Sequence, residues 1–128
     1  MFEKSINTMK KDIINSISTL VNFPSVSIDT NDKKMPFGKD CNDALIYFLD
    51  LANKLGFKTK NIDGYCGYAE FGDGSELIGI IGHLDVVPAK SDDWSYPPFS
   101  ATIDNNRIYG RGTIDDKGPV ISSLYAMK

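Results

Sequence analysis

The chain is 128 residues long and carries 14 Lys and Arg residues against 17 Asp and Glu residues, a formal net charge of −3. This length corresponds to one ordinary domain, and a composition of 41% hydrophobic and 24% charged residues excludes a disordered or collagen-like chain. The slight acidity, with no run of basic residues, argues against binding to nucleic acid or to an anionic membrane surface.

The first half of the sequence predicts two amphipathic helices. Apolar residues recur every three or four positions over residues 6–20, and the pattern stops before Pro24. Residues 22–40 are polar and irregular, and a loop of this length is often functional. Helical spacing returns over residues 45–55 and is followed by Gly56, which is placed to take the left-handed conformation that ends many helices.

The second half begins with short strand-like runs. Residues 57–62 and 67–71 are separated by an Asp-Gly turn signal, which predicts paired strands. Residues 77–81 are almost continuously apolar, as expected of a strand that is buried on both faces. Residues 101–109 hold two further runs around a central Asn-Asn pair, which predicts a hairpin.

A last helix is predicted to begin near Gly118 and Pro119, because proline is tolerated in the first turn of a helix. Its apolar spacing continues to Lys128 with no capping residue, which we interpret as a helix inside a larger fold. Helices and strands in this order favour the α/β class.

The first candidate site lies at the end of the 77–81 run, where His83 and Asp85 follow Gly82. Residues i and i+2 of an extended chain point to the same side, so the imidazole and the carboxylate face one region at the sheet edge. A carboxylate in this position can orient a metal-bound histidine. The alternative is a pair that only satisfies the end of a strand. His83 is the only histidine of the chain, which limits the metal chemistry the chain can complete.

The second candidate site is the acidic pair Asp115-Asp116, which lies between Gly112 and Gly118 just before the last helix. One such carboxylate could bridge two cations. The alternative is that an Asp caps the helix by accepting hydrogen bonds from its free N–H groups. For the acidic pair taken alone, capping is the more common outcome, because Asp is a preferred capping residue. The aromatic cluster Trp94, Tyr96 and Phe99 also allows two interpretations. It could form a binding patch, or it could belong to a loop that is anchored to the core by aromatic burial.

Taken together, these segments resemble the N-terminal signature of a family of two-metal peptidases. The family includes carboxypeptidase G, aminoacylase, succinyl-diaminopimelate desuccinylase, acetylornithine deacetylase and carnosinase. The segments that carry the resemblance are residues 82–88, 94–99, 108–112 and 115–118. Residues 35–39 and 61–65 look most like the bacterial PepV-type dipeptidases of that family.

The resemblance implies a role for each matched residue. His83 looks like a zinc ligand, Asp85 like the catalytic acidic residue that supports it, and Asp115 like the carboxylate that bridges both metals. Asp116 matches the next position, and the peptide bond that joins the pair is commonly cis in the family. The implied cofactor is two Zn²⁺ ions per complete site, with Mn²⁺ or Co²⁺ as substitutes. The implied fold is the N-terminal part of a three-layer α/β/α catalytic domain.

The implied activity is hydrolysis of the amide bond of dipeptides by a hydroxide held between the two metals. The family's Glu-Glu pair, its later acidic ligand, its distal histidine and its lid domain have no counterpart in this sequence. We therefore expect residues 1–128 to be the N-terminal portion of the catalytic domain of a longer dipeptidase, inactive alone. The remainder of that polypeptide and a dipeptide or small amide are the expected partners.

Three further expectations complete the analysis. Uncovered apolar surface is expected to promote self-association. Cys41 and Cys66 do not form a CxxC pair, and no signal peptide or apolar run of ~20 residues is present, which favours a cytoplasmic protein with free thiols. Two alternatives to a dipeptidase remain: a deacylase or desuccinylase of N-acyl amino acids in the same family, and a non-enzymatic fragment or interaction module.

Overall fold

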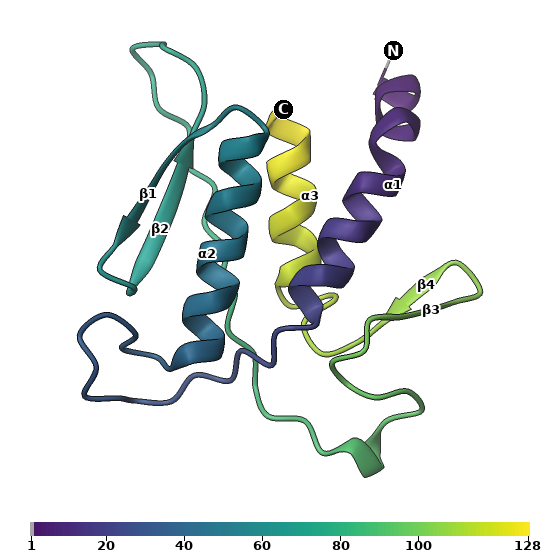
Figure 1. Ribbon diagram of the computed structural model, residues 1–128. Helices are drawn as coiled ribbons and strands as arrows, with labels where there is room; N and C mark the ends of the chain where they lie inside the picture. Colours follow the sequence, from purple (N-terminus) through teal and green to yellow (C-terminus); the bar gives the residue numbers. More distant parts are fainter. Residues whose placement is uncertain (1) are drawn as a thin grey trace.

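The computed structural model describes residues 2–128 and contains three long helices that lie side by side (Figure 1). Helix α1 spans Phe2–Val21, α2 spans Lys39–Lys54 and α3 spans Lys117–Met127. Helix α3 packs against α1, and α2 carries the β1–β2 hairpin on its other side. The two predicted N-terminal helices and the last helix are thus confirmed.

The core lies between the three helices. One cluster joins α1, α2 and α3 through Leu20, Ala44, Ile121 and Tyr125, and a second joins α2 and α3 to the start of the hairpin through Ala52, Phe57 and Leu124. The apolar spacing of α1 explains the first cluster, because it turns Met9, Ile13 and Ile17 towards the same partners.

Glycine ends α2 as predicted. Gly56 has a φ of 97°, and the N–H of Phe57 donates to the carbonyl of Ala52 at 3.0 Å, so the chain folds back on the last helical turn. Phe57 is buried there at 2% exposure. The conformation of Gly56 therefore ends α2 and sets where the first hairpin begins.

Two short antiparallel hairpins are present. Strand β1, Lys58–Ile62, pairs with β2, Cys66–Glu70, and strand β3, Thr102–Asp104, pairs with β4, Arg107–Tyr109. Asn105 and Asn106 between β3 and β4 both have positive φ angles, which is the backbone that a tight two-residue hairpin turn requires. A short 3₁₀ helix, η1, covers Ser91–Asp93. Both hairpin predictions are confirmed.

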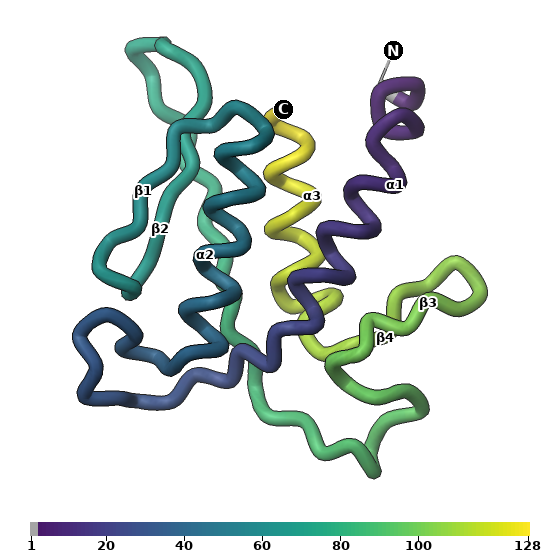
Figure 2. Tube along the Cα trace, in the orientation of Figure 1, coloured from purple at the N-terminus to yellow at the C-terminus, as the bar shows by residue number. Residues whose placement is uncertain are grey.

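The predicted buried strand at residues 77–81 is wrong for this structure. The segment forms no strand, and Leu77, Ile78 and Ile81 are 89%, 89% and 98% exposed. Figure 2 shows the chain running on from β2 past the helices along this stretch. A strand needs hydrogen-bonding neighbours to bury both faces, and within residues 2–128 no other segment supplies them.

The structure therefore confirms a mixed α/β class but not its layering. In the described residues the strands form two separate two-stranded sheets rather than one central sheet. The three-layer α/β/α arrangement stays a prediction.

Candidate metal centre

The first half of the site is an extended segment that is held at its far end. The N–H of Val86 donates to the carbonyl of Ser25 at 2.9 Å, and Val26 and Val86 form an isolated parallel bridge. The hydroxyl of Ser25, which is fully buried, donates to the carbonyl of Leu84 at 2.6 Å. Asp85 is thus flanked on both sides by residues whose backbone is fixed to the chain just after α1.

The second half is the turn that leads into α3. Gly112 has a φ of 90°, and its carbonyl accepts the N–H of Lys117 at 2.9 Å, which closes the turn around the acidic pair. The Asp115–Asp116 peptide bond is cis, as the resemblance implied. Lys117 begins α3 directly after this pair.

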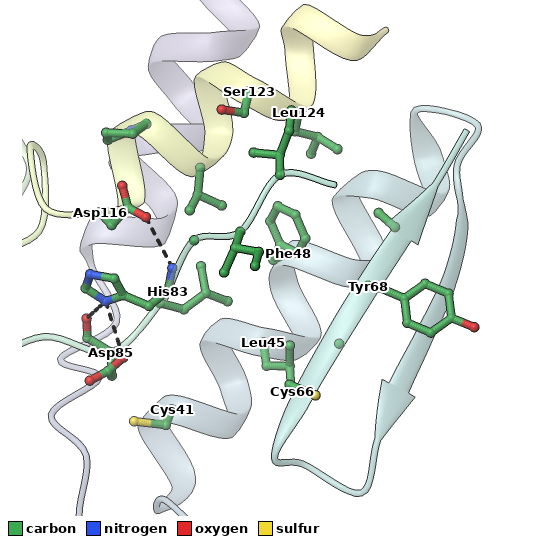
Figure 3. Close-up of a pocket in the computed structure, with 18 of the residues that line it drawn as sticks. Cys41, Leu45, Phe48, Cys66, Tyr68, His83, Asp85, Asp116, Ser123 and Leu124 are labelled. Atoms are coloured by element: carbon green, nitrogen blue, oxygen red, sulfur yellow. Dashed lines mark hydrogen bonds and ion pairs between the residues drawn. The ribbon is translucent and has the colours of Figure 1, made fainter. Parts of the chain in front are cut away.

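The two halves meet at His83. Its Nε2 lies 2.9 Å from Oδ1 of Asp115, and its Nδ1 lies 3.0 Å from the carbonyl oxygen and 3.3 Å from Oδ1 of Asp85. The backbone N–H of His83 donates to Oδ2 of Asp116 at 3.2 Å. Figure 3 shows the imidazole beside Asp85, with Asp116 on the opposite side of the His83 backbone. Residues more than 30 positions apart therefore converge on one imidazole.

This geometry decides the alternative that the sequence left open for the acidic pair. Asp116 occupies the N-cap position of α3, but its side chain makes no capping hydrogen bond and accepts from His83 instead. Asp115 also turns its carboxylate towards His83. Both carboxylates are thus directed at His83 rather than at the helix, Asp115 at its imidazole and Asp116 at its backbone N–H.

Each ring nitrogen of His83 faces an oxygen acceptor. Both ring nitrogens face oxygen atoms, so the doubly protonated ring satisfies them best, and the hydrogen bond with Asp115 raises the pKa of His83 above its usual value. A cation that replaced the proton on Nε2 would keep the Nδ1–H donation to Asp85, which is the arrangement usual for a metal-bound histidine. Imidazole nitrogen and carboxylate oxygen are both zinc ligands. His83 and Asp115 therefore fit two positions around one metal ion.

Two ligands do not complete such a site. Within residues 2–128 no group of three or more His, Cys, Asp or Glu side chains is placed to hold a metal ion. Catalytic zinc ordinarily has three protein ligands, so the donor set fits part of a metal centre.

A hollow of about 650 Å³ adjoins the site. His83, Asp85 and Asp116 line one end, and Leu45, Phe48 and Leu124 from α2 and α3 line the other (Figure 3). The hollow thus joins a polar, charged end to an apolar wall.

Two residues near the site were not singled out from the sequence. Lys117 is fully buried, and its Nζ donates to the carbonyl of Phe23 at 2.7 Å, while burial lowers the pKa of this lysine to about 8. Ser25 is also fully buried. A lysine or serine in a polar stretch carries no sequence signal of burial, because the partners that accept its hydrogen bonds lie 94 and 59 positions away in the sequence.

The aromatic residues after η1 are half-buried and contact the residues at and after β4. The guanidinium of Arg111 lies 5.0 Å from the ring centroid of Trp94, and the rings of Tyr96 and Tyr109 are 4.7 Å apart. These contacts tie the loop after η1 to strand β4 and the turn that follows it.

The chain is similar in sequence to known proteins. A model of the family described as Peptidase family M20/M25/M40 matches residues 79–128. The chain is 43% identical over 128 residues to the Bacillus subtilis (strain 168) protein named "Putative dipeptidase YtjP". That alignment covers 99% of this chain and 27% of the relative. The chain is 41% identical over 127 residues to the Beta-Ala-Xaa dipeptidase of Lactobacillus delbrueckii subsp. lactis, covering 97% and 27%.

A solved structure shares the fold. The crystal structure of human carnosine dipeptidase 1 superposes with a TM-score of 0.75 at 24% sequence identity, over 98% of this chain and 30% of that one.

In the residues described here, none of the helices has the length and apolar character needed to cross a membrane. The chain spans about a quarter of the length of the curated relatives named above. The resemblance predicted from the motifs is confirmed: the chain is similar to peptidases of the M20/M25/M40 family over that part of its relatives' length.

Proposed function

We propose that residues 1–128 form the N-terminal portion of the catalytic domain of a longer zinc dipeptidase that hydrolyses the amide bond of dipeptides. One observation carries this proposal: His83 reaches Asp115 on one ring nitrogen and Asp85 on the other. The 41% identity to a Beta-Ala-Xaa dipeptidase favours a dipeptide over an N-acyl amino acid as substrate.

In this proposal each side chain has a distinct task. His83 and Asp115 would hold the metal, and Asp85 is the catalytic acidic residue that fixes the orientation of the imidazole through Nδ1. Asp116 holds the backbone of His83 through its N–H. When bound, zinc polarises a scissile carbonyl and makes a water molecule acidic enough to react near neutral pH.

The chain alone is proposed to be inactive. Hydrolysis needs a general base and further metal ligands, and the described residues form no group of three or more side chains that could hold a metal ion. We propose that these groups, the second Zn²⁺ position and the lid belong to the remainder of the polypeptide. The free thiols of Cys41 and Cys66 are consistent with a reducing compartment such as the cytoplasm.

The test is hydrolysis by a chain extended to the length of the relatives. The extended protein, loaded with Zn²⁺ or Mn²⁺, is expected to cleave dipeptides, and His83→Ala or Asp115→Asn is expected to reduce kcat/KM at least ~100-fold. Asp92→Asn, an exposed acidic residue of η1, is the matched control and should keep full activity. Cleavage of N-acyl amino acids but not dipeptides would contradict the substrate, and no amide hydrolysis at all would contradict the proposal.

A further inference from the structure

Both halves of the site are fastened to the same four residues, 23–26, which follow α1. The extended half is fastened through Ser25, whose hydroxyl donates to Leu84 and whose carbonyl accepts from Val86. The half that precedes α3 is fastened through Lys117, whose Nζ donates to Phe23. The backbone N–H of Ser25 donates to this same Phe23 carbonyl at 2.8 Å. A single carbonyl oxygen thus accepts hydrogen bonds that lead to both halves.

The burial of Lys117 carries a free-energy cost. An ammonium group loses its hydration on burial, and here its hydrogen-bond partner is one uncharged carbonyl. The negative end of the α1 dipole nearby offsets part of that cost. A methionine would fill a similar space without burying a charge. Phe23 would also keep one donor, the N–H of Ser25, if the ammonium were removed.

We propose that Ser25 and Lys117 are positioning residues that together set the separation between His83 and Asp115. Ser25 ties the extended half of the site to residues 23–26, and Lys117 ties the half before α3 to the same residues. Ser25 fixes the backbone on either side of Asp85. Lys117 directly follows the Asp115-Asp116 pair and is itself held by its hydrogen bond to Phe23. The use of this separation for metal binding rests on the proposed function. The separation itself is a property of the metal-free chain, so it can be tested without activity.

The probe is the imidazole of His83, which gives a single set of signals because the chain has one histidine. Spectra that connect the carbon-bound ring protons to both ring nitrogens are recorded at about pH 5, where the ring is protonated. Asp115→Asn provides the reference position of the Nε2 signal when the charged acceptor is lost. Lys117→Met and Ser25→Ala are each expected to move Nε2 towards that reference. The exposed residues Lys10 and Ser122 supply the controls Lys10→Met and Ser122→Ala, which should leave it in place.

Zinc affinity gives a second readout with the same probe. Substitution of a residue that orients metal ligands typically lowers affinity 10–100-fold, so the apparent Kd for Zn²⁺ should rise at least ~10-fold in both variants and remain unchanged in both controls.

The urea midpoint of Lys117→Met should stay at or above that of the unsubstituted chain. A merely structural lysine would instead lower the midpoint and leave the His83 signals of the folded protein unchanged.

The outcomes separate this proposal from the proposed function. Folded Lys117→Met protein with unchanged His83 signals and unchanged Zn²⁺ affinity overturns the positioning role, whatever the extended protein hydrolyses. Shifted signals together with an extended protein that cleaves no amide would support the positioning role and refute the dipeptidase. If Ser25→Ala does not fold, Lys117→Met alone decides the question.

Discussion

Gly118 lies where the acidic turn meets α3, and an alanine there should disturb the site from a distance. The Cβ of an alanine would fall about 0.9 Å inside the 3.0 Å closest approach that real Cβ atoms keep, and the atom it would meet is the backbone oxygen of Thr113. A backbone atom cannot rotate away as a side chain can. The turn that carries Asp115 must therefore move by about 1 Å relative to α3.

The size of the effect follows from two opposing contributions. Inserting a methyl group into a closely packed position costs about 3 kcal/mol at the upper end of the usual range, which applies here because backbone must shift. Replacing a helical glycine by alanine returns about 1 kcal/mol. We expect Gly118→Ala to lower the free energy of unfolding by about 2 kcal/mol, which moves the urea midpoint by about 1 M. In the extended protein, a 1 Å misplacement of Asp115 should reduce kcat about 100-fold.

Gly79→Ala is the matched control. Nothing lies within 4 Å of a Cβ built at Gly79, so the free energy of unfolding should change by less than about 0.5 kcal/mol. Urea unfolding and the ring-nitrogen signals of His83 are measured for both variants. If Gly118→Ala unfolds at the midpoint of the unsubstituted chain and leaves the His83 signals unmoved, the close approach of the turn to α3 does not hold the site, and the reasoning fails.

Three other predictions concern the core, the thiols and the apolar surface. Leu124→Ala removes a fully buried side chain between α2 and α3 and should cost about 2–5 kcal/mol of unfolding free energy by urea denaturation; a loss below 1 kcal/mol would contradict the packing. Burial raises the pKa of the Cys41 thiol, so at pH 8 iodoacetamide should label exposed Cys66 about 10-fold faster by peptide mass spectrometry. The Cys41 rate should keep rising with pH above the usual thiol range, because a raised pKa delays thiolate formation. The chain should self-associate through residues 77–81 in light scattering, and Ile78→Lys with Ile81→Lys should reduce this; a monomeric unsubstituted chain at high concentration would rule it out.

Local patterns predicted most of the elements. The spacing of apolar residues located α1 and α2, and Gly56 marked the turn into β1 because its conformation depends on few residues. The Asn105-Asn106 pair located the second hairpin for the same reason. These features depend on residues close in sequence, which is why they could be read without a structure.

Features that depend on distant residues were harder to predict. Residues 77–81 have the composition of a buried strand, but composition does not supply the neighbouring strands that burial requires. The burial of Lys117 depends on a carbonyl 94 positions away. The meeting of His83 with Asp115 was predicted only from the family resemblance, because the acidic pair taken alone favoured helix capping.

The packing of α1 against α3 has a consequence for synthesis on the ribosome. These helices lie side by side (Figure 1), and the hydroxyls of Ser16 and Tyr125, 3.0 Å apart, are separated by 109 positions in the sequence. At about 5–20 residues per second, α1 emerges roughly 5–20 seconds before the helix that covers its apolar stripe. During that interval the stripe is open to chaperones and to other nascent chains. Helix α1 therefore completes its packing only after α3 has been synthesised.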